Sequence, residues 1–407
     1  MYINLNDKKT LILLTSEFPY GTGETFLENE FPFLTAQFDE ILIFTENRKG
    51  LSRINSEKVQ VNLLSSANWF NRIQSFFSTE FYKEIYHLSK NKKLNLFTFR
   101  TVWYSMSKAF VIANFIEKWT LEKGCFFYSY WLDEKSISLA LLKKKHPNIN
   151  VVSRAHGWDV YEERHTNNYL PFRNLLFESL DTVYTISENA KKYFNSAYLS
   201  SNSNTEISRL GTLPLNSVSE KIKDSHFHFL SISSLISLKR VDKILELVSS
   251  IPELKIKWTH IGSGQLHDKL SSIASKKSQE NINFSFEFLG QKSNSEVRNF
   301  LSSNYVDLFI NLSETEGIPV SIMEAQSAGI PALATNVGGT SEIVNSDNGF
   351  LIPKDFEVAD LASKIKYYLK SSEEEIEKKR QSAYQNWKQF YNAETNYKYF
   401  VNQFTKY

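Results

Sequence analysis

Two glutamates, Glu316 and Glu324, follow an apolar strand that we expect to end at Asn311. A sugar and a ribose are both rings of hydroxyls, and a carboxylate accepts well from two neighbouring O–H donors. Two glutamates at this spacing could hold the two ends of one nucleotide-sugar. The alternative is that Glu316 only complements a helix dipole and that Glu324 is a solvated helix residue.

The loop between the glutamates contains glycine and proline, and a helix is predicted to begin near Val320. Parallel α/β sheets bind ligands at the carboxyl ends of their strands, and the backbone N–H groups of a helix start attract anions. We expect this segment to donate to sugar hydroxyls or to phosphate. Its candidate donor-binding residues are Gly317, Ile318, Pro319 and Val320.

Basic and imidazole side chains follow other predicted strands. Lys239 comes after a strand and a short loop, where an ammonium can neutralise a diphosphate; the alternative is an ordinary exposed lysine. Arg240 could face either phosphate or solvent. His156 follows a strand expected to end near Ser153, and it serves either the substrate or the fold. Asp159, three residues later, could simply orient the loop.

Glycine-rich turns follow two further strands. Gly23 lies in a turn after the first strand, where glycine lets backbone approach a ligand, and Thr25 with Glu28 fits a capping box that opens a helix. Any strand-to-helix connection could need such a turn. Gly264 belongs to a Gly-x-Gly pair without the third glycine of a dinucleotide fingerprint. His260, within an apolar run, is predicted to be structural.

The segment Ser313 to Ala325 resembles the Glu-x7-Glu signature of retaining glycosyltransferases of family 4, the glycosyl transferases group 1 domain. Further pieces of the family pattern occur in the right order. They are Leu238-Lys239-Arg240-Val241-Asp242, Gly262-Ser263-Gly264, Phe288-Leu289-Gly290 and Gly338-Gly339-Thr340. Ser153 to Tyr161 and Tyr169 to Arg173 look like the bacterial polysaccharide and lipopolysaccharide branch.

The resemblance implies a GT-B architecture, α/β with two Rossmann-like domains whose parallel sheets face each other across a cleft. It implies that Lys239 neutralises the leaving diphosphate, that Glu316 holds the sugar and that Glu324 holds the ribose. It also places the base near Gly290 and Gln291, a glycine-rich loop at Gly23 over the donor and acceptor, and His156 on the transferred sugar. We add Gly264 and Arg240 as candidate donor-binding residues.

The sequence departs from the family pattern at Ser234, where the family usually carries an arginine five residues before the lysine. One of the two expected cations on the phosphates is therefore missing. Three arginines are candidates to replace it, namely Arg154, Arg173 and Arg240.

Short apolar runs alternate with longer amphipathic stretches, which predicts two parallel-sheet domains. We predict an acceptor-binding domain at 1–212, a hinge at 213–226, a nucleotide-sugar domain at 227–386 and a C-terminal helix at 387–407 that returns to the first domain. The predicted strands are Thr10–Thr15, Ile41–Thr45, Phe126–Tyr130, Asn150–Ser153, Thr182–Ser187, Phe227–Ser233, Lys255–Ile261, Phe284–Leu289, Val306–Asn311, Ala332–Thr335 and Gly349–Ile352.

Composition narrows the class of function. The formal net charge is +2, so no global field favours nucleic acid. The single cysteine, Cys125, lies in an apolar run and is expected to be a buried structural thiol. Without a Cys/His cluster or an Asp-x-Asp metal motif, we predict no metal site, no cofactor and metal-independent chemistry. With no export signal and no membrane-spanning run, we expect a cytoplasmic protein.

The region 68–123 combines nine Lys/Arg with four Glu and many aromatic residues. Aromatic residues on amphipathic helices usually pack into a core. The alternative is a basic, aromatic surface that lies peripherally on the inner face of the cell membrane.

The sequence thus predicts a retaining transferase (EC 2.4) that moves a sugar to a glycan or lipid-linked acceptor in cell-surface polysaccharide assembly. A UDP-sugar is the favoured donor and a GDP-sugar the second. Two alternatives remain: a non-catalytic nucleotide-sugar-binding scaffold subunit, or another enzyme of the same architecture. The Glu-x7-Glu pattern argues against an epimerase, and no lysine context for pyridoxal phosphate supports a phosphorylase.

Overall fold

The computed structural model describes residues 8–21, 23–65, 69–198, 204–221 and 226–406. The chain forms two compact units. Unit 1 runs to Arg209 and takes in the chain from Tyr397 onward, and unit 2 is Leu210–Asn396. Asn68 and residues 222–225 of the predicted hinge lie outside the described residues.

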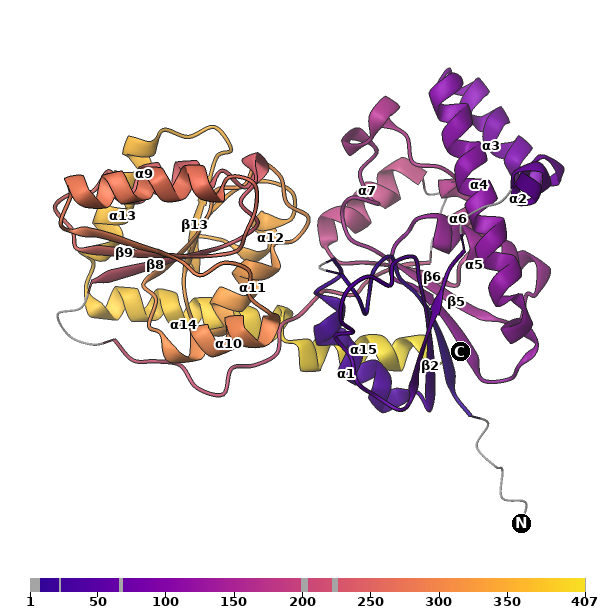
Figure 1. Ribbon diagram of the computed structural model, residues 1–407, viewed down its shortest axis with the longest axis horizontal. Helices are drawn as coiled ribbons and strands as arrows, with labels where there is room; N and C mark the ends of the chain where they lie inside the picture. The colour runs from indigo at the N-terminus through magenta and orange to yellow at the C-terminus, as the bar shows by residue number, and fades with distance from the viewer. Residues whose placement is uncertain (1–7, 22, 66–68, 199–203, 222–225, 407) are drawn as a thin grey trace, which may run out of the picture. The chain divides into compact units, whose positions relative to one another are not determined.

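In unit 1, the described residues form a seven-stranded parallel sheet in the order β3-β2-β1-β4-β5-β6-β7 (Figure 1). This is the Rossmann order extended by one strand, and the chain reverses direction across the sheet between β1 and β4. Its strands are β1 Thr10–Leu14, β2 Glu40–Thr45, β3 Val59–Leu63, β4 Cys125–Ser129, β5 Asn150–Ala155, β6 Thr182–Thr185 and β7 Thr205–Ile207.

Two helical layers cover this sheet (Figure 1). Alternate residues of β1 point to opposite faces, so Leu11 and Leu13 pack with α1 and the C-terminal helix α15, while Ile12 and Leu14 pack with α4 and α5. The helices are α1 Leu27–Gln37, α2 Trp69–Gln74, α3 Thr79–Lys90, α4 Leu96–Ile116, α5 Glu134–Lys145, α6 Arg173–Ser179, α7 Glu188–Tyr198 and α15 Ala393–Phe404. Short 3-10 turns are Ser75–Phe77, Glu117–Leu121, Glu162–Arg164 and Thr166–Asn168.

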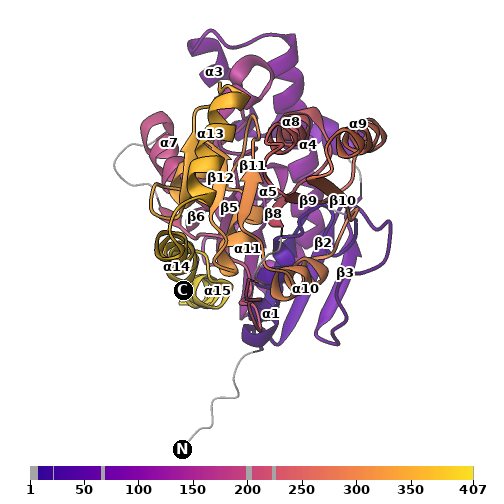
Figure 2. The ribbon, with the colours of Figure 1, turned by 90° about the vertical axis from the view of Figure 1, so that its left-hand side faces the viewer.

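In unit 2, the described residues form a six-stranded parallel sheet in the order β10-β9-β8-β11-β12-β13. Figure 2 shows this sheet with unit 2 facing the viewer. Helices α8, α9 and α13 cover one face, and α10, α11 and α14 the other (Figure 2). The strands are β8 Phe227–Ile232, β9 Ile256–Ile261, β10 Phe284–Phe288, β11 Leu308–Asn311, β12 Ala332–Thr335 and β13 Gly349–Ile352. The helices are α8 Val241–Ser249, α9 His267–Glu280, α10 Asn294–Ser303, α11 Val320–Ser327, α12 Thr340–Ile343, α13 Val358–Leu369 and α14 Glu373–Phe390, with a 3-10 turn at Ser237–Lys239.

The predicted α/β class with two Rossmann-like parallel sheets is confirmed, and every predicted strand is present within a few residues. The strands β3 and β7, which are the two edge strands of unit 1, were not predicted from the sequence. Both are short, and β3 is half-buried or exposed along its length, so neither shows the apolar run of a central strand.

Candidate functional site

Unit 2 brings Lys239 and Glu316 together at the point where its strand order reverses. β8 and β11 are hydrogen-bonded neighbours in the centre of the sheet, and the chain leaves them toward opposite edges. The loops that follow these strands carry Lys239 and Glu316, and the N–H of Glu314 donates to the carbonyl of Leu238 at 2.9 Å to join the loops. Ligands of doubly wound sheets bind in such crevices.

The two charged side chains form an ion pair. Lys239 Nζ lies 2.7 Å from Glu316 Oε1, and the side chains are 25% and 11% exposed. Asn311, the last residue of β11, donates from Nδ2 to the same carboxylate oxygen at 3.2 Å. The arrangement presents one cation and one anion side by side, so it can bind an anionic group and a hydroxyl next to each other.

Glu324 lies on α11, eight residues after Glu316, and its side chain is buried. Burial raises the pKa of this carboxyl to about 7, against the opposing field of Arg298. Among the described residues no hydrogen bond to its carboxylate is found. A buried carboxyl without such a partner is costly unless a ligand supplies one.

Two glycines press directly onto the Glu316 loop. A Cβ at Gly338 would lie 1.9 Å from the carbonyl oxygen of Glu316, and the residue has φ +55°. A Cβ at Gly339 would lie 2.7 Å from the carbonyl oxygen of Gly317, which accepts from the N–H of Gly339 at 2.7 Å. The β12–α12 turn therefore supports the segment Gly317 to Val320, and sequence analysis quoted these glycines without assigning them this role.

Gly264 and Gly290 lie in neighbouring loops after β9 and β10. A Cβ at Gly264 would be 2.5 Å from the carbonyl oxygen of Leu235, so glycine is required there by loop packing alone. Gly290 has φ +68° and open space around the missing Cβ, and its carbonyl accepts from the N–H of Gly262 at 2.9 Å. Gln291 is exposed beside it.

Arg240 is placed differently from the prediction. Its guanidinium donates to the carbonyls of Leu312 at 2.6 Å, Lys354 at 3.0 Å and Ser313 at 3.4 Å. The guanidinium N–H groups that could bind a phosphate are therefore already used by these carbonyls. We assign Arg240 a structural role, in which it holds the loops after β11 and β13 together.

The other two arginines that could replace the cation missing at Ser234 also have their guanidinium groups bound within the protein. Arg154 is fully buried and its Nη1 lies 2.8 Å from Glu30 Oε2. Arg173 is buried and donates to the carbonyls of Leu132 at 2.8 Å and Asp159 at 2.7 Å. Neither guanidinium is available to a diphosphate in the described conformation.

Gly23 and His156 lie together in unit 1, joined through Trp131. The indole N–H of Trp131 donates to Glu24 Oε1 at 2.6 Å, and the Trp131 and His156 ring centroids are 4.6 Å apart. A Cβ at Gly23 would lie 2.8 Å from Glu17 Oε2. The glycine thus makes room for the Glu17 carboxylate, which accepts its N–H at 2.8 Å.

His156 is buried between the rings of Tyr130 and Trp131, and neither ring nitrogen has a hydrogen-bond partner among the described residues. Burial lowers its pKa to about 3, so the imidazole is neutral at neutral pH. It can therefore act as a neutral donor or acceptor but not as a proton source. Asp159 accepts from the N–H groups of Leu132, His156 and Gly157, which gives it the loop-orienting role.

The remaining candidates are structural. Cys125 is buried, and burial raises the pKa of its thiol to about 11. His260 is buried, with Nδ1 2.8 Å from Ser231 Oγ and Nε2 3.1 Å from the carbonyl of Ser233. No group of three or more metal-ligating His, Cys, Asp or Glu side chains is found in the described parts of the chain.

Comparison with known proteins agrees with the geometry of unit 2. The family described as "Glycosyl transferases group 1" matches residues 215–390. The chain is 34% identical over 131 residues to the O-antigen biosynthesis glycosyltransferase WbnH of Escherichia coli. The aligned residues cover 32% of this chain and 34% of WbnH. The chain thus matches about a third of this relative's length.

A second relative and a solved structure extend the comparison. The putative colanic acid biosynthesis glycosyltransferase WcaL of Escherichia coli is 25% identical over 49% of this chain and 50% of its own. The crystal structure of Anabaena Alr3699/HepE in complex with UDP and glucose superimposes with a TM-score of 0.67 over 98% of this chain and all of that chain. Its identity is 15%, so this likeness shows the fold, which is that of the GT-B glycosyltransferases.

Proposed function

We propose that this chain, which carries a group 1 glycosyltransferase domain at residues 215–390, transfers a sugar from a nucleotide-sugar to a hydroxyl of a glycan or lipid-linked acceptor in cell-surface polysaccharide assembly. The observation that carries the proposal is the Lys239–Glu316 pair at the strand reversal of unit 2, followed on the next helix by buried Glu324. The O-antigen and colanic acid relatives support the polysaccharide context.

Each residue has a role in the proposed reaction. Glu324 accepts from the ribose hydroxyls, which supply the missing partners of its buried carboxyl. Glu316 accepts from the sugar, and Lys239 turns from Glu316 toward the diphosphate. The backbone N–H groups at the start of α11 complete the anion site.

The proposed chemistry is retaining and needs neither metal nor cofactor. The acceptor hydroxyl attacks the anomeric carbon on the face that the diphosphate leaves. The bond from anomeric carbon to phosphate oxygen breaks, the nucleoside diphosphate keeps the electron pair, and a phosphate oxygen takes the acceptor proton. Lys239 stabilises the charge that develops on the leaving group, a preorganised electrostatic effect that is usually the largest in catalysis.

UDP-sugars are the favoured donors and GDP-sugars the second. A structure with the same fold holds UDP and glucose. Gln291 beside the open space at Gly290 is the proposed contact for the base.

A thermal-shift screen against UDP, GDP, ADP and their sugar conjugates tests the donor site. We expect one nucleotide to stabilise the protein by about 2.7 kcal/mol at 100 times its Kd. Because the ionised carboxyl of Glu324 is the better acceptor and its pKa is about 7, affinity should rise about tenfold from pH 6 to pH 8. Glu324→Gln should weaken nucleotide binding. It should also abolish the pH dependence that comes from Glu324 and leave only the part that comes from titration of the nucleotide phosphates.

The matched control for this screen is Glu342→Gln, because Glu342 also lies on a short unit 2 helix but is only half-buried. Absence of a shift with every nucleotide would refute the donor site. Nucleotide binding with full cellular function of a Glu316→Ala variant would instead favour the scaffold alternative.

We further propose that unit 1 contacts a membrane surface through α3 and α4. Phe81 is buried, but Tyr82, Tyr86 and Tyr104 on these helices are between 56% and 69% exposed. Exposed lysines and Arg100 share these helices, so the surface fits anionic lipid headgroups. No helix among the described residues is long and apolar enough to cross a membrane.

Vesicle sedimentation tests this contact. We expect binding to vesicles containing anionic phosphatidylglycerol and a several-fold loss in Tyr82→Ser/Tyr86→Ser. The control is Tyr367→Ser, because Tyr367 is 78% exposed on α13 of unit 2. Equal sedimentation of the two variants would refute the assignment of the surface.

A further inference from the structure

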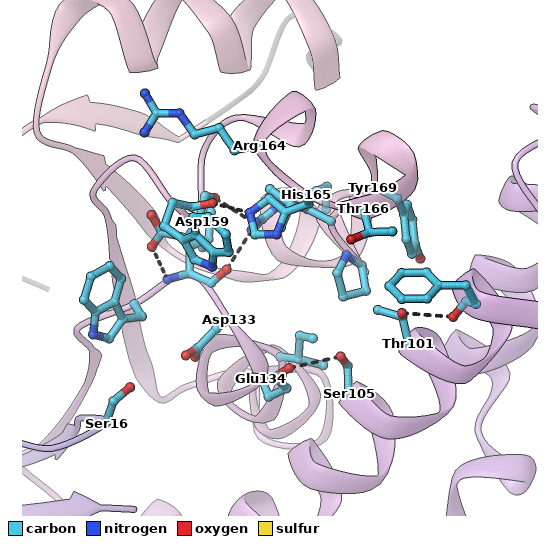
Figure 3. Close-up of a pocket in the computed structure, with 18 residues that line it drawn as sticks. Ser16, Thr101, Ser105, Asp133, Glu134, Asp159, Arg164, His165, Thr166 and Tyr169 are labelled. Atoms are coloured by element: carbon cyan, nitrogen blue, oxygen red, sulfur yellow. Dashed lines mark hydrogen bonds between the residues drawn. The ribbon is translucent and has the colours of Figure 1, made fainter. Parts of the chain in front are cut away.

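Unit 1 contains a cavity of about 580 Å³ that sequence analysis did not anticipate (Figure 3). It opens beside the carboxyl ends of β1, β4 and β5, because Ser16, Asp133 and Asp159 follow these strands. This is the strand-reversal point of the unit 1 sheet, the place where doubly wound sheets bind ligands. Helix α4 forms another wall with Phe97, Thr101 and Ser105.

Aromatic faces and oxygen acceptors share the lining. Trp131, Trp158, Phe97 and Tyr169 contribute rings, and the residue Trp158 is 63% exposed. Asp133 and Glu134 contribute carboxylates, and Ser105 Oγ donates to Glu134 Oε1 at 3.2 Å. Apolar walls with a few convergent polar groups are typical of small-molecule sites.

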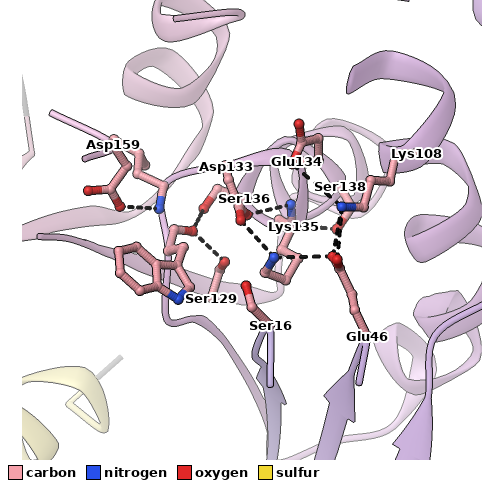
Figure 4. A network of polar contacts seen from close by, with 12 residues as sticks. Ser16, Glu46, Lys108, Ser129, Asp133, Glu134, Lys135, Ser136, Ser138 and Asp159 are labelled. Carbon is pink, nitrogen blue, oxygen red and sulfur yellow. Dashed lines mark hydrogen bonds and ion pairs between the residues drawn. The ribbon is translucent and has the colours of Figure 1, made fainter. Parts of the chain in front are cut away.

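A charged network fixes the carboxylates at the cavity wall (Figure 4). The ammonium of Lys135, 1% exposed, lies 2.6 Å from Asp133 Oδ2 and 3.2 Å from Glu46 Oε1. Lys108 lies 2.9 Å from the same oxygen of Glu46 and 3.9 Å from Glu134 Oε2. Burial raises the pKa of Asp133 to about 6 against the field of Lys135, so this carboxylate is mostly ionised and remains an acceptor at neutral pH.

The opposite wall is a loop held by buried contacts. Glu84 of α3 accepts from the hydroxyl of Tyr169 at 2.6 Å and from the N–H of Phe172 at 3.0 Å. Phe172 has φ +61°, which a bulky residue adopts only when its surroundings hold it. Arg173, which follows this loop and also lines the cavity, donates to the carbonyls of Leu132 and Asp159.

We propose that this cavity binds an uncharged, hydroxyl-rich sugar ring, with one face stacked on Trp158 and its hydroxyls donating to Asp133 and Glu134. Arg164 and Arg173 also line the cavity, but the Arg164 guanidinium lies over the ring of Tyr161 and Arg173 donates to backbone carbonyls. The carboxylates of Asp133 and Glu134 therefore face the sugar; carboxylates accept from pairs of hydroxyls and repel an anionic sugar. Aromatic rings supply large apolar contact with defined geometry. The proposal rests on the proposed function in one respect, which is that the bound sugar is identified as part of the acceptor.

Saturation-transfer NMR on the full chain without nucleotide tests the proposal. The probes are the methyl glycosides of glucose, galactose and N-acetylglucosamine, with methyl glucuronide as the anionic probe. We expect transfer to at least one neutral glycoside and a weaker signal from the glucuronide. The signal should fall at least fivefold in Trp158→Ala and persist in Trp158→Phe, which keeps an aromatic face.

The matched control is Tyr399→Ala, because Tyr399 is 55% exposed in the same unit but outside the cavity lining. Its signal should equal that of the unaltered protein. No transfer to any neutral glycoside, an equal signal in Trp158→Ala, or preference for the glucuronide would overturn the proposal.

The nucleotide thermal shift of Trp158→Ala separates the two hypotheses. Sugar binding without any nucleotide shift would refute the proposed function but leave the cavity as a sugar site. A retained nucleotide shift without sugar binding would refute only the cavity.

Discussion

Replacing Lys239 with methionine is expected to lower kcat by about 100- to 1,000-fold, because the leaving diphosphate then loses its preorganised cation. The three arginines named as candidates to replace the cation missing at Ser234 cannot compensate, since Arg154 pairs with Glu30 while Arg173 and Arg240 donate to backbone carbonyls. Substitution also leaves the carboxylate of Glu316 without the ammonium that lies 2.7 Å away. The measurement is the rate of nucleotide release from the donor that gives the largest thermal shift.

The control for Lys239→Met is Lys243→Met, one turn further on α8 in an exposed pair with Glu246. It should retain the rate within about twofold, as surface pairs contribute little. Glu316→Gln should also slow turnover but, with the ammonium still present, should keep the affinity for the free nucleoside diphosphate. A change of less than fivefold in Lys239→Met would contradict the role given to the ammonium.

The proximity of Lys239 and Glu316 was predictable because topology alone brings the two residues together. Lys239 and Glu316 follow two apolar strands, and the reversal of a doubly wound sheet makes those strands neighbours. The burial of Glu324 was not predictable from its spacing to Glu316, because a helix residue eight positions after Glu316 can face either the solvent or the core. Contacts of the Gly338–Gly339 turn with the Glu316 loop depend on packing between two loops, and no local pattern specifies this.

Side chains with several possible partners were the main source of error. Thr25 and Glu28 fit a capping box, yet α1 begins after Phe26 without a side-chain cap, and Glu28 Oε1 lies 2.6 Å from Arg53 Nη1. Arg240 likewise takes backbone carbonyls from two distant strands. In both cases a partner remote in sequence outcompetes the local one.

The unit 1 cavity could not be found from the sequence because its lining comes from four separated segments. Ser16, Thr101, Asp133 and Trp158 stand in different parts of the chain, and only Trp158 lies in a segment that resembles the family pattern. The sequence feature that did point to this region is the position of residues 131–134, shortly after a central strand. That position predicts proximity to a ligand but not the cavity's shape.

Replacing Arg154 with methionine is expected to destabilise unit 1 by about 3–5 kcal/mol, because it leaves the Glu30 carboxyl buried without its counter-charge. Both side chains are fully buried, and the Arg154 guanidinium also lies 4.3 Å from the ring centroid of Phe400 on α15. Urea unfolding followed by circular dichroism measures the loss. The control is Lys118→Met, because Lys118 is exposed. Its loss of stability should stay within about 1 kcal/mol, the size of an exposed cation–π contact such as the one with Trp119.

The penalty in Arg154→Met should depend on pH in a defined direction. Burial already raises the pKa of Glu30 in the intact pair, and removal of Arg154 removes the field that opposes this rise. A carboxyl whose folded pKa exceeds its unfolded pKa costs stability as pH rises from the unfolded value toward the folded one. Arg154→Met should therefore be closer to the unaltered protein at pH 5 than at pH 8, and Glu30→Gln/Arg154→Met should recover part of the loss at pH 8. A penalty independent of pH would show that lost packing against α15, rather than the unpaired carboxyl, is what destabilises the variant.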